Sequence, residues 1–166
     1  MNHVAAIALG SNLNSEWGDP AANLREAVRR IGELGEVRAL SSFYETAPVG
    51  YADQPDFTNA ALLLETELEP LELMRALLGI ERAMGRDRSA AVPPKGARII
   101  DLDLLLVDSV VLHTPELTLP HAALAERRFV LEPLAEIAPE MRHSTSSKTV
   151  REMLDALTRL DPSEQR

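Results

Sequence analysis

The hydrophobic positions of the chain follow two periods, one typical of β-strands and one typical of α-helices. Extended apolar segments, which predict strands, cover residues 4–9, 37–46, 57–68 and 99–107. Helical spacing follows Asp19-Pro20 and again Pro70, and each of these helices ends before a glycine, Gly35 and Gly85 respectively. The order of elements is therefore β-α-β-β-α-β.

Two further helices are predicted in the C-terminal part of the chain. Residues 129–137 are apolar at helical spacing, and Thr149 followed three residues later by Glu152 is typical of a capping box. The whole pattern predicts an α+β fold, a ferredoxin-like β-α-β-β-α-β sandwich with helices on one face of an antiparallel sheet, plus C-terminal helices. With 166 residues, we expect a single domain over residues 1–166.

Composition excludes several classes of function. The chain has 17 Lys and Arg against 26 Asp and Glu, a net charge of 17 − 26 = −9, which opposes broad binding to nucleic acid or to an anionic membrane. It has no cysteine, so disulfides and thiolate metal sites are excluded. Neither a signal peptide nor an apolar run of membrane-spanning length is recognisable, so we expect a cytoplasmic protein. We also expect a monomer.

Two aspartates interrupt the most strand-like segment of the chain. Asp101 and Asp103 share one face of the predicted strand, with their carboxylates about 7 Å apart, while Leu102 points to the other face. Two like charges in an apolar strand repel each other, and a divalent cation is a common compensation; oxygen ligands without His or Cys favour Mg²⁺. The alternative is that both lie at a strand end, solvated or paired with arginine.

Arginines gather beside these carboxylates in the sequence. Arg86, Arg88 and Arg98 border a proline-containing loop that leads into the strand, and Arg127 follows His121 further along. A guanidinium group can bind two phosphate oxygens at once. Carboxylates with metal beside several arginines therefore indicate phosphoryl transfer. For each arginine taken alone, a solvated surface residue is the favoured interpretation, and His121 could equally be a turn residue.

Six motifs in order closely resemble the 6-hydroxymethyl-7,8-dihydropterin pyrophosphokinase family. They are Ala8-Leu9-Gly10-Ser11-Asn12-Leu13, Ser42-Phe43-Tyr44-Glu45-Thr46, Asp53-Gln54-Pro55-Asp56-Phe57-Thr58-Asn59-Ala60-Ala61, Glu81 through Gly85-Arg86, Arg98-Ile99-Ile100-Asp101-Leu102-Asp103 and Leu119-Pro120-His121. The resemblance implies that pyrophosphate passes from ATP to the hydroxymethyl group of a reduced pterin alcohol in folate biosynthesis, giving AMP.

The same resemblance implies a role for each matching residue. Asp101 and Asp103 would hold two Mg²⁺ ions, and Arg86 and Arg98 would be catalytic. The expected ATP contacts are Glu81, Arg88, Thr118, His121 and Arg127. The expected pterin contacts are Thr46, Pro48, Val49, Phe57, Asn59 and Phe129.

Two alternatives to this enzyme come from the residues themselves. The first is a non-catalytic ferredoxin-like regulatory module in which the aspartates and arginines form structural ion pairs. The second is nucleic-acid binding on the sheet, but the chain has neither the excess of basic residues nor the aromatic pairs of an RNA-binding sheet. For the enzyme, we expect the loop over residues 86–98 to act as a lid that closes over ATP, because it contains glycine and prolines and has arginines at both ends.

Overall fold

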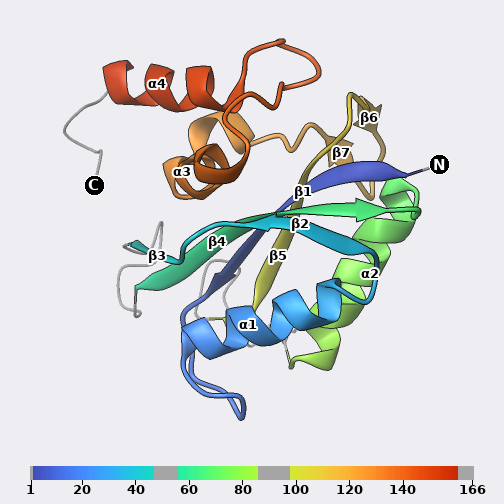
Figure 1. The fold of residues 1–166 in the computed structure, drawn as a ribbon, viewed down its shortest axis with the longest axis vertical. Coiled ribbons are helices and arrows are strands. Elements are labelled where there is room, and N and C mark those ends of the chain that lie inside the picture. The colour runs from blue at the N-terminus through green and yellow to red at the C-terminus, as the bar shows by residue number, and fades with distance from the viewer. Residues whose placement is uncertain (1, 47–55, 86–97, 161–166) are drawn as a thin grey trace.

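An antiparallel sheet forms the centre of the molecule in the computed structural model, which describes residues 2–46, 56–85 and 98–160 (Figure 1). Its strands are β1 (His3–Ser11), β2 (Glu36–Leu40), β3 (Tyr44–Thr46), β4 (Phe57–Thr66) and β5 (Asp101–Val107). The order across the sheet is β2-β4-β1-β5, with β3 also paired to β4, and every pairing is antiparallel. This order confirms the predicted ferredoxin-like plan, in which β4 separates the two strands joined by the first helix.

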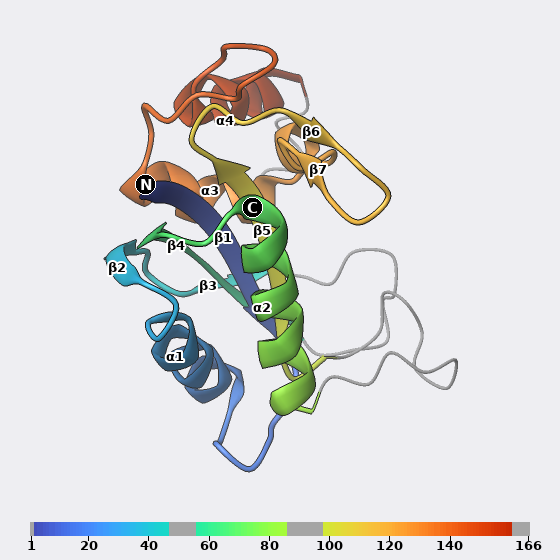
Figure 2. The ribbon, with the colours of Figure 1, turned by 90° about the vertical axis from the view of Figure 1, so that its right-hand side faces the viewer.

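Helices α1 (Pro20–Ile31) and α2 (Pro70–Ala83) cover one face of the sheet, as predicted (Figures 1 and 2). Each begins with proline in its first turn, and the Asp19 side chain caps α1 by accepting a hydrogen bond from Ala22 N at 2.9 Å. These helices bury Leu24, Leu73 and Leu77 in one hydrophobic core with Ile7, Leu9 and Leu62 of the sheet. These apolar contacts hold both helices on this face.

Helix α3 (Arg128–Ile137) covers the opposite face, and α4 (Val150–Leu160) packs against α3, both above the sheet in Figure 1. The predicted capping box is present: Glu152 N donates to Thr149 Oγ1 at 3.1 Å, and Thr149 N donates to Glu152 Oε1 at 2.9 Å. The sheet residues below α3 include the small side chains of Ala6, Ala8 and Ala61. Because the C-terminal helices pack here, the sheet is covered on both faces rather than on one.

The structure differs from the predicted elements in three places. The extended stretch 37–46 is two strands, because the chain leaves the ladder over residues 41–43. A small hairpin of β6 (Leu112–His113) and β7 (Thr118–Leu119) and a 3-10 turn, η1 (Leu124–Glu126), were not predicted, since two or three residues carry too little periodicity. Among the described residues, none of the helices has the length and apolar character needed to cross a membrane.

Candidate active site

Sheet register brings two groups of predicted site residues to one face. Gly10 of β1 pairs with Asn59 of β4 on one side and with Asp101 of β5 on the other. Directly paired residues of a sheet lie on the same face, so all three residues belong to the face that α3 covers further along the strands. Neighbouring strands are about 5 Å apart, so the Asn59 and Asp101 backbones are separated by about 10 Å.

Asp101 and Asp103 point to this face while Leu102 between them is buried in the opposite core, as the alternation predicted. Both carboxylates are about one third exposed. Arg98 Nη1 lies 3.5 Å from Asp101 Oδ1, Arg127 Nη1 lies 4.0 Å from Asp103 Oδ2, and His121 Nε2 lies 4.0 Å from Asp103 Oδ1. The predicted carboxylates and three of the residues predicted to contact phosphate are therefore one cluster.

The protonation of His121 follows from its surroundings. Burial lowers its pKa below the ordinary value, and the nearby positive charge of Arg127 lowers it further, against an opposing effect of Asp101. Its Nδ1 accepts a hydrogen bond from Ala123 N at 3.2 Å, which leaves the ring proton on Nε2. Nε2 is the nitrogen that faces Asp103, so His121 presents a neutral N–H donor to the cluster.

Two buried side chains fix the backbone on which the cluster is built. Glu81 is 0% exposed, and its Oε2 accepts a hydrogen bond from Leu102 N at 2.7 Å, between the two aspartates. Asn12 binds the backbone of Arg98 twice: its side-chain Oδ1 accepts from Arg98 N at 2.6 Å, and its backbone N–H donates to Arg98 O at 2.9 Å. Sequence reasoning missed both roles. Glu81, which is also a predicted ATP contact, is fully buried and binds the backbone of the strand that carries the aspartates.

Three residues of the second predicted group, Asn59, Thr46 and Phe57, lie side by side on β3 and β4. Asn59 is buried, and its Nδ2 donates to Thr46 Oγ1 at 2.6 Å, while Thr46 pairs with Phe57 across β3 and β4. Phe129 lies in the first turn of α3, half-buried, with the Arg127 guanidinium 5.8 Å from its ring centroid. The amide of Asn59, the hydroxyl of Thr46 and the ring of Phe57 lie at one end of the sheet and are suited to a flat polar heterocycle. We call these three residues the heterocycle-binding group.

The remaining predicted site residues lie on another strand or outside the described part of the chain. Thr118 lies on β7, and His121 N donates to Leu105 O at 2.9 Å, which joins the segment after that hairpin to β5. Four residues lie outside the described part of the chain: Pro48, Val49, Arg86 and Arg88. The predicted lid over residues 86–98 also lies outside it, except for Arg98.

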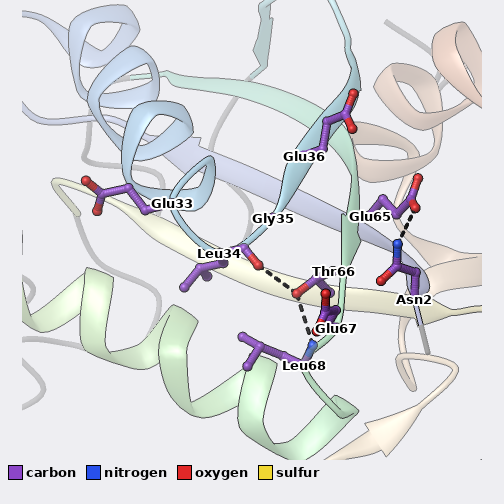
Figure 3. A pocket seen from close by; sticks show the side chains of 9 residues that line it. All are labelled: Asn2, Glu33, Leu34, Gly35, Glu36, Glu65, Thr66, Glu67 and Leu68. Atoms are coloured by element: carbon purple, nitrogen blue, oxygen red, sulfur yellow. Dashed lines mark hydrogen bonds between the residues drawn. The ribbon is translucent and has the colours of Figure 1, made fainter.

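A cavity of about 400 Å³ lies at the far end of the sheet (Figure 3). Glu33, Glu36, Glu65 and Glu67 line it, together with Thr66, whose hydroxyl donates to Leu34 O at 2.7 Å. Thr66 pairs with His3 at the start of β1, whereas the cluster described above lies at the end of that strand. This acidic cavity is therefore separate from the predicted site.

Comparison with known proteins gives a consistent result. Residues 6–139 match the family described as 7,8-dihydro-6-hydroxymethylpterin-pyrophosphokinase. A 2-amino-4-hydroxy-6-hydroxymethyldihydropteridine pyrophosphokinase of Bacillus subtilis is 42% identical over 155 residues, which are 92% of this chain and 89% of that protein. Its counterpart in Methylorubrum extorquens is 43% identical over 161 residues, covering 96% and 94% respectively.

Longer proteins match over part of their length. The folic acid synthesis protein fol1 of Schizosaccharomyces pombe is 37% identical over 158 residues, and the chain spans 21% of it. A crystal structure of Plasmodium falciparum HPPK-DHPS superimposes with a TM-score of 0.76 at 16% identity, covering 99% of this chain and 45% of that one, and shows the shared fold.

Fold, site and relatives together define a transferase of phosphorus-containing groups. The chain belongs to the 7,8-dihydro-6-hydroxymethylpterin-pyrophosphokinase family. Its function is pyrophosphoryl transfer to hydroxymethyldihydropterin in folate biosynthesis.

Proposed function

We propose that this transfer takes place on the sheet face shared by Asn59, Gly10 and Asp101, with ATP as the pyrophosphoryl donor. The observation that carries the proposal is the pairing of Gly10 with Asn59 on β4 and with Asp101 on β5. The heterocycle-binding group and the carboxylate cluster therefore lie on the two strands that flank β1. A pterin bound at Asn59, Thr46 and Phe57 would thus direct its hydroxymethyl group toward the aspartates. That short span is what a direct transfer between two bound substrates requires.

The donor set of the cluster fits Mg²⁺. Two oxygen-ligand carboxylates, partly exposed, face the site, and the described residues include no group of three His, Asp or Glu side chains that could enclose a metal. Mg²⁺ commonly takes only one or two carboxylates and completes its coordination with water and phosphate. Asp101 and Asp103 would hold the two ions, which would supply positive charge to offset that of the ATP phosphates.

The reaction forms one P–O bond and breaks another. The hydroxymethyl oxygen of the pterin attacks the β-phosphorus of ATP, and the bond from that phosphorus to the oxygen bridging the α- and β-phosphates breaks. The electron pair of the broken bond stays on AMP, and the hydroxyl proton is released to solvent. Arg98, whose backbone Asn12 holds, would stabilise the growing negative charge, together with Arg86.

The other predicted contacts complete the proposed nucleotide site. His121 would donate its Nε2–H to a phosphate oxygen, and Arg127 would bind the triphosphate beside it. Thr118 and Arg88 would contact the nucleotide. Glu81 would hold β5 in place below the nucleotide by accepting the hydrogen bond from Leu102 N.

A direct assay of AMP formation tests the proposal. AMP should appear only when ATP, the reduced pterin alcohol and Mg²⁺ are all present. Asp101→Asn and Asp103→Asn should each remove nearly all turnover, whereas Asp155→Asn, on the exposed face of α4, makes the same chemical change and should leave turnover intact. AMP formation that continues without pterin or in excess chelator would contradict the proposal.

A further inference from the structure

The segment between β2 and β3 contains one residue more than the strand it faces. Leu40 pairs with Leu62 and Tyr44 pairs with Asn59, so three residues, 41–43, lie opposite two, 60–61. Ser41 stays bonded to β4, because its N–H donates to Ala61 O at 2.9 Å and its Oγ accepts from Ala61 N at 2.9 Å. The extra residue therefore forms a bulge directly after Ser41, and Ser42 N–H leaves the ladder.

Glu136, in the last turn of α3, binds this bulge. Its two carboxylate oxygens accept from Ser42 N at 3.1 and 3.0 Å, Ser42 Oγ donates to Oε2 at 3.0 Å, and Tyr44 Oη donates to Oε1 at 2.7 Å. A carboxylate in the last turn of a helix is unfavourable for the helix dipole. Glu136 at this position therefore stabilises the bulge and does not stabilise α3.

The electrostatics of the pair keep this contact intact at neutral pH. The hydrogen bond from Tyr44, followed by those from Ser42, lowers the pKa of Glu136 against the opposing effect of burial, so its carboxylate stays ionised. The same hydrogen bond raises the pKa of Tyr44 to about 12, so its hydroxyl stays a donor.

The register of β3 depends on this bulge. β3 is only three residues long, so its own ladder holds its register weakly. In the observed register Thr46 shares a face with Asn59, and its Oγ1 receives the 2.6 Å hydrogen bond from Asn59 Nδ2. A slip by one residue would turn Thr46 to the other face of the sheet and break that bond.

We propose that Glu136 is a positioning residue for the heterocycle-binding group, acting through Ser42 and Tyr44 to fix where Thr46 meets Asn59. The inference rests on the proposed function, because it assigns pterin recognition to Thr46 and Asn59. Glu136 also links this group to α3, on which Phe129, another predicted pterin contact, lies seven residues earlier, about 10 Å along the helix. Glu136 itself does not touch the reacting atoms.

The test compares the two substrates in steady-state kinetics. Glu136→Ala removes every acceptor atom from an exposed helix position, where alanine is a good helix former, so α3 should not be weakened. The KM for the pterin should rise about tenfold, which corresponds to about 1.4 kcal/mol, while the KM for ATP and the melting temperature change little. Glu140→Ala, an exposed carboxylate just beyond α3, is the matched control and should behave as the unaltered protein.

A double-mutant cycle with Tyr44→Phe shows whether both residues act through one contact. The rise in pterin KM of the double variant should be clearly smaller than the product of the two single effects. A pterin KM within twofold of the unaltered protein in Glu136→Ala overturns the inference, and so does an equal rise in both KM values with a fall in melting temperature. Failure of the proposed function is distinguishable, because the unaltered protein would then form no AMP with any pterin alcohol.

Discussion

Replacing Gly10 with alanine would place a methyl group between the two halves of the proposed site. The new Cβ would lie 3.0 Å from Asn59 Oδ1 and 3.7 Å from Phe57 Cδ1. The first distance is shorter than an ordinary van der Waals contact, so the Asn59 side chain must turn. That side chain is held by its 2.6 Å hydrogen bond to Thr46 Oγ1, which the turn would weaken.

The size of the effect follows from these two changes. Turning a side chain by about 30° from its rotamer costs about 1 kcal/mol, and weakening a hydrogen bond costs about 1 kcal/mol more. A loss of about 2 kcal/mol corresponds to an approximately thirtyfold weaker pterin affinity. Gly10 is not among the positive-φ glycines of the described chain, Gly18 and Gly85, so its backbone accepts alanine. Stability should fall by only about 1–1.5 kcal/mol, because the preference for alanine over glycine in a strand, about 0.5–1 kcal/mol, offsets part of the same strain in the free protein.

Calorimetric titration with the reduced pterin, in the presence of Mg²⁺ and a nonhydrolysable ATP analogue, measures this loss directly. A parallel titration with the ATP analogue alone should give an unchanged affinity. Gly79→Ala on α2 is the matched control, since nothing lies within 4 Å of its added Cβ and helix propensity should make the protein slightly more stable. The reasoning is refuted if Gly10→Ala binds pterin within twofold of the unaltered protein, or if nucleotide affinity falls equally.

Three further predictions concern the charged groups. Asp101→Ala or Asp103→Ala should nearly abolish AMP formation while the melting temperature of the unliganded protein stays equal or rises, because two neighbouring carboxylates no longer repel each other; full activity in both variants would remove the metal assignment. Arg98→Ala should lower kcat by at least about tenfold with less effect on the KM for ATP, as measured by single-turnover and steady-state assays, since charge on the transferring group grows toward the transition state. An effect on ATP affinity alone would limit Arg98 to binding. Hydrogen bonds to Glu69 and Asp108 raise the pKa of His3 above its ordinary value of 6.5. The protonated ring therefore contributes stability that is fully present below about pH 6.5 and is lost as pH rises through the raised pKa. Urea unfolding from pH 6 to 9 should show this decline, which His3→Gln should abolish, and an equal slope in both proteins would be inconsistent with it.

Local chemistry accounts for what the sequence could predict. Proline in the first turn, the Asp19 cap and the capping box of Thr149 and Glu152 act within a few residues, so those helix starts were predictable. The common orientation of Asp101 and Asp103 follows from strand alternation alone. The residues of the heterocycle-binding group came from the resemblance of whole motifs.

The missed features depend on residues far apart in the sequence. At the break of the stretch 37–46, Ser42 N donates to Glu136, which is 94 residues away. The buried carboxylate of Glu81 meets Leu102 N across 21 residues, and Asn12 meets Arg98 across 86. No local pattern in the sequence encodes such contacts, since they form only once the strands are paired.

The position of β1 at the centre of the sheet has a consequence for biosynthesis. β1 precedes the other strands of this sheet in the chain, yet it pairs with β4 and β5, so Ala5 finds Val107 only after about 100 further residues have been made. Until then the hydrogen-bonding edge of β1 that β5 will occupy has no partner strand, and an open strand edge is a template for pairing with other chains. A nascent chain that stalls before residue 101 thus exposes this edge beside the apolar residues Ile7 and Leu9. Completion of β5 closes the edge and brings Asp101 and Asp103 to the site in the same event.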